Sequence, residues 1–355
     1  MELPDELRAA LDDTLAALPA KRLAAVAGDL SRRYRAGGAV TGGGYARSAE
    51  EVAAYAATRM PATFGAITAA LAQTRERLPE WRPRTLLDVG AGPGTAMWAA
   101  VEVWPELERV TLVEREAEMS ALGQRLAARA PLPAVRTAEW RRADVLGVWD
   151  AAIPPHDMVI AAYVLGEMPP ERVEELARAL WSRTAGALLL VEPGTPAGFA
   201  RIRAARDLLL AEPGAATVAP CPHDRPCPMP ENDWCHFAQR VARTRRHRQL
   251  KAGELGYEDE KFAYAALARL PVTPIGARVI RHPWSQPGLI RLELCAPGGL
   301  TSRTVTRKDR ARFRQARDLR WGAALPASDA EWMDISPGPS PRRGGVAEPL
   351  PQPLP

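Results

Sequence analysis

Apolar positions along the chain follow two periodicities, and the change from one to the other divides the sequence. Helical spacing at 3–30 and 50–71 predicts an N-terminal helical region. From 85 to 194, short apolar runs alternate with helical stretches, which predicts a doubly wound parallel α/β sheet. We expect its strands at 85–90, 110–114, 135–138, 157–163 and 186–192. The helical region would then act as a cap or docking surface for this sheet.

A glycine-rich turn follows the first expected strand. The segment from Asp88 to Gly94 reads DVGAGPG, and an apolar helix is expected at 95–103. Such glycines let the backbone turn sharply and approach a ligand, to which the helix N-terminus offers unpaired N–H groups. Glu114 ends the next strand twenty residues after Gly94, the spacing of a ribose-binding acid. The sequence therefore predicts a nucleoside site at the carboxyl ends of the strands.

The D-x-G-x-G-x-G form of this turn resembles the class I S-adenosylmethionine-dependent methyltransferases, which have a Rossmann-like fold. The resemblance implies that Asp88 lies near the methionine end, Glu114 binds the ribose hydroxyls and Asp144 lies near the adenine. Pro93 removes one N–H from the turn, which suits a ligand without phosphates better than a nicotinamide cofactor. We therefore expect S-adenosylmethionine as the cofactor. Its predicted contacts are Asp88, Gly90, Ala91, Gly92, Gly94, Glu114, Asp144 and Tyr163.

The catalytic residues stay unassigned. Amino-methyltransferases that act on nucleic acids carry [N/D]-P-P-[Y/F] after the fourth strand, and this chain has AAYVLGE at 161–167. The Pro-Cys pairs at 220–221 and 226–227 follow the fifth strand, so neither is placed as the nucleophile of a pyrimidine C5 methyltransferase. The sequence thus predicts cofactor binding without a recognisable methyl-transfer apparatus.

The second informative stretch is CPHDRPCPMPENDWC at 221–235. The cysteines of the chain are Cys221, Cys227, Cys235 and Cys295, separated by five, seven and fifty-nine residues. These loops are wider than the C-x2-4-C pairs of zinc sites, and proline after the first two cysteines is typical of ferredoxin-type ligation. We expect a 4Fe–4S cluster on the four cysteines. Zinc, with His223 or His236 as substitute ligands, and free thiols are the alternatives.

Two further segments, DWCHF and GELGYEDEKFAYAAL, make a more specific resemblance when taken with CPHDRPCP and the earlier LLDVGAGPGT. Over about residues 30–320 the chain resembles the mitochondrial small-ribosomal-subunit assembly family, the Rsm-twenty-two and methyltransferase-like protein seventeen type, which has bacterial relatives. The resemblance implies a bacterial member with a methyltransferase fold, an S-adenosylmethionine pocket and a cluster held by the four cysteines. It also implies association with small-subunit rRNA during assembly.

Chain length and composition suggest how these motifs are divided. A chain of 355 residues is long enough for about two domains. We expect an N-terminal helical region at 1–80, an S-adenosylmethionine-binding domain at 81–211, an inserted cysteine-rich cluster region at 212–275, and a C-terminal β-hairpin that completes the sheet, with a basic segment, at 276–332. The Pro-, Gly- and Ser-rich end at 333–355 is expected to be a disordered tail.

Positive charge is concentrated in two runs, although the net charge of the chain is only +5. The predicted RNA contacts of the first run are Arg240, Arg243, Arg245, Arg246, Arg248 and Lys251; those of the second are Arg307, Lys308 and Arg310. Runs of this kind are often solvated faces, but two of them flanking the cysteines favour a basic surface beside the metal site. Phosphate contacts there would make binding strongly salt-dependent.

The start of the chain is acidic and amphipathic, unlike a signal peptide, and no apolar run approaches the ~20 residues of a membrane span. We therefore expect a cytoplasmic protein with reduced thiols, monomeric when free, whose partners are the small ribosomal subunit and its rRNA. The first functional hypothesis is an assembly factor with little or no turnover. The alternatives are an active rRNA methyltransferase and a small-molecule methyltransferase with a structural zinc site.

Overall fold

The structure is a computed structural model that describes residues 1–16, 22–23, 25–26, 28–29, 48–145, 153–243 and 255–327. The tail predicted at 333–355 lies outside these ranges. So do Arg245, Arg246, Arg248 and Lys251 of the first basic run. No helix within the described ranges is both long and apolar enough to span a bilayer.

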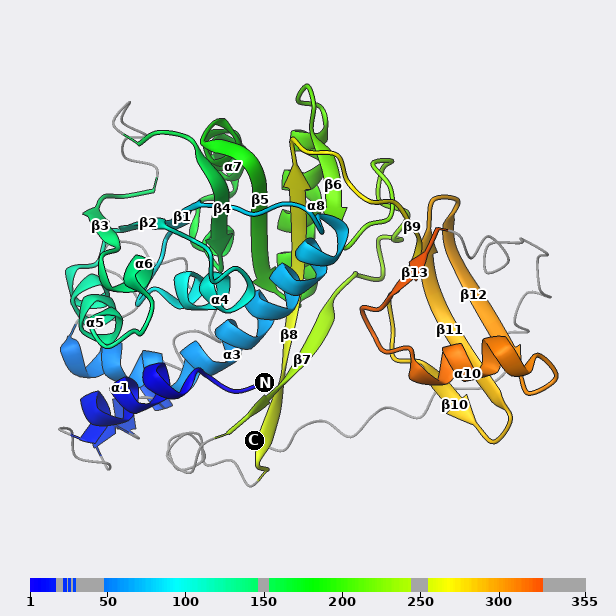
Figure 1. Cartoon of the computed structure of the whole chain (residues 1–355), viewed down its shortest axis with the longest axis horizontal. Helices are drawn as coiled ribbons and strands as arrows, with labels where there is room; N and C mark the ends of the chain where they lie inside the picture. The colour runs from blue at the N-terminus through cyan, green and yellow to red at the C-terminus, as the bar shows by residue number, and fades with distance from the viewer. Residues whose placement is uncertain are drawn as a thin grey trace.

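The larger of two sheets has eight strands and carries the expected α/β core (Figure 1). Its path runs β3-β2-β1-β4-β5-β8-β6, and β7 pairs with β8. The first five strands are parallel, whereas β8 runs antiparallel to β5, β6 and β7. Their bounds are β1 Thr85–Val89, β2 Arg109–Glu114, β3 Glu139–Arg142, β4 His156–Ala162, β5 Thr184–Pro193, β6 Ala216–Ala219, β7 Phe237–Ala242 and β8 Tyr257–Ala268. The doubly wound parallel sheet predicted from the sequence is confirmed.

Helices cover both faces of this sheet because successive strand residues point to opposite sides. Leu86 packs into a core with α1, α3, α4 and α5, whereas Leu87 packs into a second core with α7 and α8. Figure 1 shows α3 crossing the first face along much of the sheet. The bounds are α1 Asp5–Ala16, α3 Ala49–Arg77, α4 Thr95–Val103, α5 Ala117–Ala127, α6 Pro133–Arg136, α7 Val173–Ser182 and α8 Pro196–Leu210, with 3-10 turns η1 Leu165–Glu167 and η2 Pro170–Arg172.

One predicted strand was misplaced. Residues 133–136 form the short helix α6, and the strand β3 begins only at Glu139. Pro133 stands at the first helical position, where its fixed φ favours a helical turn and its missing N–H costs nothing. The edge strand β3 therefore comes after the apolar segment at 135–138, where the sequence pattern predicts it.

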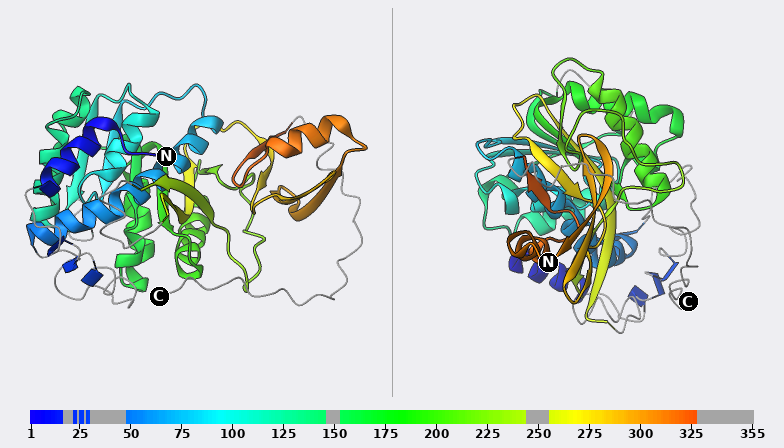
Figure 2. Two further views of the ribbon diagram at one scale, coloured as in Figure 1. Left: turned by 90° about the horizontal axis from the view of Figure 1, so that it is seen from below. Right: turned by 90° about the vertical axis from the view of Figure 1, so that its right-hand side faces the viewer.

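The smaller sheet lies to one side of the larger one and is covered by α10 (Figures 1 and 2). Its path is β10-β11-β9-β13, with β12 paired to β11. The bounds are β9 Ile275–Val279, β10 Trp284–Gln286, β11 Leu289–Ala296, β12 Gly299–Thr306, α10 Arg310–Asp318 and β13 Ala324–Pro326. The helix packs Phe313, Ala316 and Leu319 against one face of this sheet, and the third hydrophobic core lies between them.

The arrangement of residues 212–332 differs from the predicted division into an inserted region and a C-terminal hairpin. Strands β6, β7 and β8, which fall in the range expected to be an insertion, belong to the main sheet. Strand β8 completes that sheet, and the expected C-terminal hairpin instead joins the separate smaller sheet. Strand β8 belongs to the main sheet because it pairs with β5 over seven residues, from Ala268 opposite Ala187 to Phe262 opposite Pro193. The cysteine segment between β6 and β7 is therefore anchored at both ends in the main sheet.

Candidate functional site

The glycine turn between β1 and α4 has the conformation that its sequence requires. Gly90, Gly92 and Gly94 all have positive φ, at 67°, 55° and 82°. The N–H groups of Gly90 and Ala91 donate to the Val113 carbonyl of β2 at 2.9 and 3.1 Å, which fixes the turn against the next strand. A Cβ placed on Gly92 would meet no atom within 4 Å. The turn therefore leaves open space beside its backbone.

A cavity of about 640 Å³ lies at this turn, at the carboxyl ends of β1, β2 and β4. Four of the eight predicted cofactor contacts line it: Gly90, Gly92, Glu114 and Tyr163. The other lining residues are Tyr55, Arg115, Glu116, Met119, Val145, Ala162, Val164, Glu167 and Met168. The location agrees with the rule that open α/β sheets bind ligands beyond their carboxyl strand ends.

Glu114 is held rigidly at the floor of this cavity. Its Oε2 accepts the N–H of Gly92 at 2.7 Å, and its Oε1 accepts the N–H of Glu116 at 2.8 Å. These two bonds orient a carboxylate that keeps lone pairs for hydroxyl donors. The side chain expected to bind ribose is thus positioned by the backbone on both sides.

Asp88 accepts a backbone hydrogen bond from the first turn of helix α4. Its carboxyl is 1% exposed, does not line the cavity, and accepts the Met97 N–H of α4 at 3.2 Å. Burial raises the pKa of Asp88 to about 7, although this hydrogen bond acts in the opposite direction. Gly94 is the N-cap residue of α4, and Ala91 is buried within the turn. These three predicted contacts shape the turn and are absent from the cavity lining.

Asp144 also lies outside the lining, and its side chain is 48% exposed. Arg115 connects it to the cavity, since Nη1 lies 3.8 Å from Asp144 and Nη2 lies 3.9 Å from Glu167. Burial raises the pKa of Glu167 to about 8, with the nearby Arg115 charge opposing that shift. A cation and a weakly acidic carboxyl therefore face the cavity beside the predicted adenine contact.

Helix α3 belongs to the helical region expected to cap the sheet, but its contribution to the cavity was not among the predicted contacts. Tyr55 of this helix lines the cavity, and Arg59 lies 3.2 Å from Glu260 of β8. The hydroxyl of Tyr163 donates to the same Glu260 carboxylate, also at 3.2 Å. Tyr163 has φ 63°, an unusual conformation for a residue other than glycine. Only the helical spacing around Tyr55 could have indicated that α3 covers this end of the sheet.

A second cavity, of about 560 Å³, is lined by all four cysteines (Figure 1 shows its elements). Three come from the segment between β6 and β7, and Cys295 comes from β11 of the smaller sheet. Cys295 faces the same side as Arg278 and Leu300, its cross-strand partners, and both of these also line the cavity. Three thiols of one short segment and a fourth that is distant in sequence thus meet at the junction of the two sheets.

Cys295 is buried, and the other three cysteines are partly buried. Burial raises the pKa of Cys221, raises that of Cys235 well above its ordinary value, and raises that of Cys295 to about 12. Like-charge interactions among the cysteines add to each of these shifts. Within the described ranges, no three Cys, His, Asp or Glu side chains form a group that could hold a metal ion as they stand.

The two histidines of the zinc alternative occupy different positions. His223 Nε2 lies 3.8 Å from the Cys295 sulfur, so this ring is beside the thiols. His236 instead stacks on Trp234, and its ring centroid lies 5.0 Å from that of Trp321. It does not line the cysteine cavity. Of the two, only His223 is near a cysteine sulfur in the contacts of the described chain.

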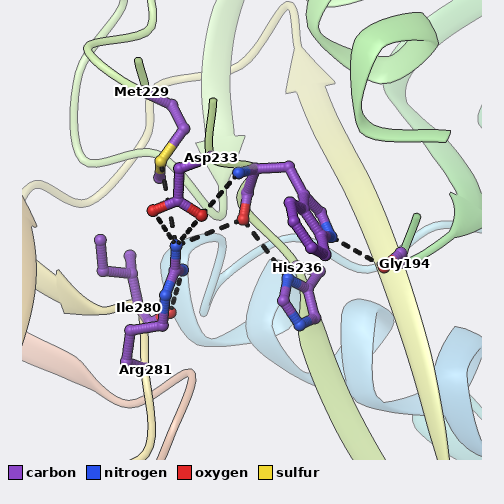
Figure 3. Close-up of polar contacts among 7 residues, drawn as sticks. Gly194, Met229, Asp233, His236, Ile280 and Arg281 are labelled. Carbon is purple, nitrogen blue, oxygen red and sulfur yellow. Dashed lines mark hydrogen bonds and ion pairs between the residues drawn. The ribbon is translucent and has the colours of Figure 1, made fainter. Parts of the chain in front are cut away.

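The cysteine segment is tied to both sheets near Cys235 (Figure 3). Trp234 Nε1 donates to the Gly194 carbonyl after β5 at 2.9 Å. Arg281, which follows β9, donates to both carboxylate oxygens of Asp233 at 2.7 and 2.6 Å. Figure 3 shows the Arg281 and Asp233 side chains facing each other. The segment thus connects the smaller sheet to the main one.

The predicted RNA contacts fall in two different settings. Arg240 forms a two-pronged ion pair with Asp259 at 2.8 and 3.0 Å, and Arg243 contacts Glu258 at 2.9 Å. These acids lie on the neighbouring strand β8, so the charges of Arg240 and Arg243 are offset by acids that the first run itself lacks. Arg307, Lys308 and Arg310 are exposed where β12 leads into α10.

Comparison with known proteins decides the family. The model of a family described as mitochondrial small ribosomal subunit Rsm22 matches residues 49–326. The chain belongs to the Rsm22 family. The family predicted from the cysteine block and the glycine turn is therefore confirmed.

Curated Rsm22 relatives are longer than this chain. The human ribosome assembly protein METTL17, mitochondrial, is 32% identical over 299 residues, which cover 77% of this chain and 62% of the relative. The Rsm22-cox11 tandem protein 2, mitochondrial, of Schizosaccharomyces pombe is 27% identical over 68% of this chain and 38% of its own length. Among solved structures, magnesium protoporphyrin IX methyltransferase from Synechocystis, with bound SAH, aligns at 14% identity and a TM-score of 0.39, over 68% of this chain and 93% of that one.

Proposed function

We propose that this protein is an assembly factor of the small ribosomal subunit that binds rRNA. The support is its membership of the Rsm22 family and its similarity to the human ribosome assembly protein METTL17. The observation that carries the proposal is the convergence of the four cysteines on one cavity, in a chain whose glycine turn lines a second cavity of the nucleoside-binding type. The chain spans 62% of the human relative, so its own partners are assigned here by proposal.

S-adenosylmethionine is the proposed ligand of the glycine-turn cavity. The residues fit such a ligand, because Gly92 leaves free space beside the backbone and Glu114 presents an oriented carboxylate at the end of β2. In this proposal Gly90 and Gly92 contact the ligand through their backbone, Glu114 binds its ribose hydroxyls, and Tyr55 with Tyr163 closes the cavity. The ligand would supply a methyl group if an acceptor is bound, or serve as a structural ligand if none is.

A 4Fe–4S cluster is the proposed occupant of the cysteine cavity. The donor set fits, since four thiols line one cavity and cluster iron binds cysteine thiolates. Cys221, Cys227, Cys235 and Cys295 would hold it, and binding would displace the thiol protons that burial retains. Bound there, the cluster would cross-link the smaller sheet to the main sheet, because Cys295 comes from β11 and the other three precede β7.

The smaller sheet and α10 are the proposed rRNA contact. Residues 275–327 contain eleven Arg and Lys side chains against three Asp and Glu. This excess is larger than the net charge of the whole chain, +5, so the remaining residues are net acidic. Arg307, Lys308 and Arg310 are exposed at the β12–α10 turn of this unit. Clustered exposed cations are the electrostatic signature of a phosphate-binding surface. The pairing of Arg240 and Arg243 with acids makes the first run the weaker candidate.

The experiment that tests this function uses a strain that lacks the gene. We expect immature small-subunit particles to accumulate and the wild-type gene to restore their maturation, whereas normal subunit profiles without the gene would contradict the proposal. Mass spectrometry of the rRNA from the same strain distinguishes a methyltransferase. One missing methyl group that is restored by the wild type but not by Glu114→Ala, which changes a residue that lines the cavity, would replace the non-catalytic assembly role with an enzymatic one.

A further inference from the structure

Three buried arginines from three different elements surround the cysteine segment. Arg77 at the end of α3 donates to the carbonyl of Cys221, and Arg206 of α8 donates to those of His223 and Arg225 at 2.8 and 3.0 Å. Arg278 of β9 donates to the carbonyls of Pro220 and Gly322, both at 2.9 Å. Arg206 and Arg278 line the cysteine cavity, and Arg77 does not.

The two cavity-lining arginines keep donors that the protein does not use. Arg206 is 3% exposed and Arg278 is 1% exposed. Nevertheless Nε of Arg206 and Nη2 of Arg278 have no hydrogen-bond partner among the described residues. A buried charged donor without a partner destabilises the fold more than a neutral one does. Two such groups facing one cavity indicate that an acceptor belongs there.

The charge around the cavity points to an anionic acceptor. Among the described residues, no Asp or Glu lines the cavity. The carboxylates that pair with these arginines lie outside the lining: Glu76 is 4.0 Å from Arg278 and 54% exposed, and Asp207 pairs with Nη1 of Arg206. The Arg278 charge also helps burial to lower the pKa of Arg77 to about 10, so the guanidinium groups repel one another. Arg206 and Arg278 line the cavity together with Cys221 and Cys295, and Arg278 is the cross-strand neighbour of Cys295, so their charge lies beside the thiols.

We infer that Arg206 and Arg278 are the counterions of the metal centre, donating their unused Nε–H and Nη2–H groups to its sulfur atoms. The inference rests on the proposed function, since it requires a centre on the four cysteines. Four thiolates around a core of charge about +2 leave a net charge of about −2, which two buried guanidinium groups balance. Hydrogen bonds to the sulfurs and nearby positive charge are known means by which proteins set a cluster's reduction potential.

Anchoring the loop does not by itself account for these side chains. Arg77 anchors the same segment from outside the cavity, through Cys221, Val218 and Thr273 carbonyls. It therefore provides a matched control: a buried arginine that holds the loop but does not face the thiols. A purely structural role predicts the same phenotype for all three arginines, whereas counterions act on the centre itself.

The test compares Arg278→Gln and Arg206→Gln with Arg77→Gln in the full chain, loaded anaerobically with iron and sulfide. Reduction adds negative charge, so loss of a guanidinium disfavours it. We expect each cavity variant to lower the equilibrium constant of one-electron reduction about tenfold, a shift of about 59 mV to more negative potential. Arg77→Gln should lower the melting temperature and leave the potential within a third of that shift. If the centre is zinc, the measured quantity is instead the rate of zinc release to a chelator. We expect this rate to be about tenfold faster in the cavity variants than in the wild type.

Each outcome is decisive. If either cavity variant fails to hold a centre while Arg77→Gln holds one, the arginines are required by the centre and the inference stands. The inference is overturned if the cavity variants hold a centre with the wild-type reduction potential and zinc-release rate. It is also overturned if Arg77→Gln changes the potential or the rate as much as the cavity variants do. In both cases the cofactor proposal survives. If the wild type takes up neither iron–sulfur nor zinc, both proposals are overturned together.

Discussion

Replacing Asp88 with asparagine is expected to stabilise the protein at high pH. The Asp88 carboxyl is 1% exposed, and burial raises its pKa from 3.8 to about 7. The folded state therefore binds the proton more tightly than the unfolded state does. Stability contributed by this group is complete below pH ~4, falls as the pH rises toward 7, and stays reduced above that. The amide introduced by Asp88→Asn does not ionise, so this dependence should disappear in the variant.

The magnitude follows from the size of the shift. About three pKa units at about 1.36 kcal/mol each correspond to about 4 kcal/mol of destabilisation above pH 7. Asparagine keeps an oxygen that can accept the Met97 N–H, but its amide adds buried donors that cost about 1–3 kcal/mol if unpaired. The net gain of Asp88→Asn at pH 8 is therefore about 1–3 kcal/mol, with no gain at pH 4. Glu192, whose pKa burial raises to about 7, leaves part of the pH dependence in the variant.

Urea unfolding of the full chain at pH 4.5, 6 and 8 measures this effect. The control is Asp157→Asn, because Asp157 accepts the N–H groups of Arg84 and Thr85 at 2.8 and 3.0 Å at the opposite end of the sheet. That variant should lose stability at pH 8, because hydrogen bonds to a charged carboxylate are stronger than those to a neutral amide. The reasoning is refuted if Asp88→Asn is less stable than wild type at pH 8, or if its stability falls with pH as steeply.

Three further variants probe the other sites. Cys295→Ser should abolish the metal centre and lower the melting temperature of the loaded protein to that of the apo protein; retention of full iron and sulfide would contradict the ligand assignment. Gly92→Ala places a side chain at φ 55°, costing about 1–2 kcal/mol, and fills the open space there, so S-adenosylmethionine affinity by calorimetry should fall at least tenfold while the fold is kept. Replacing Lys308 and Arg310 with Gln should weaken rRNA binding and reduce the slope of log K against log salt by about 1–2, whereas an unchanged slope would exclude them as phosphate contacts.

The part of the fold that could be predicted is the part encoded locally. The strands around Asp88 and Glu114 were placed correctly because short apolar runs, glycines and an acid at fixed spacing mark them within about thirty residues. The segment at 135–138 was mistaken for a strand because its apolar residues suit either element, and Pro133 decided for a helical turn. Strand β8 could not be placed, because its pairing with β5 depends on contacts distant in sequence.

The same limit applies to the sites. Spacing indicated that the four cysteines form a set, but not that Cys295 arrives from a second sheet. The buried arginines could not be found, since arginine in sequence is expected at the surface and nothing local marks Arg206 or Arg278 as enclosed. The acids that offset Arg240 and Arg243 were missed for a related reason: cross-strand partners on β8 are separated from them along the chain.

Elemental analysis of the anaerobically purified full chain tests most directly whether the four cysteines share a metal centre. We expect about four iron and four sulfide per chain in the wild type, and neither in Cys295→Ser. Wild-type protein that contains neither iron nor sulfide nor zinc, or Cys295→Ser that retains its full content, would contradict the claim.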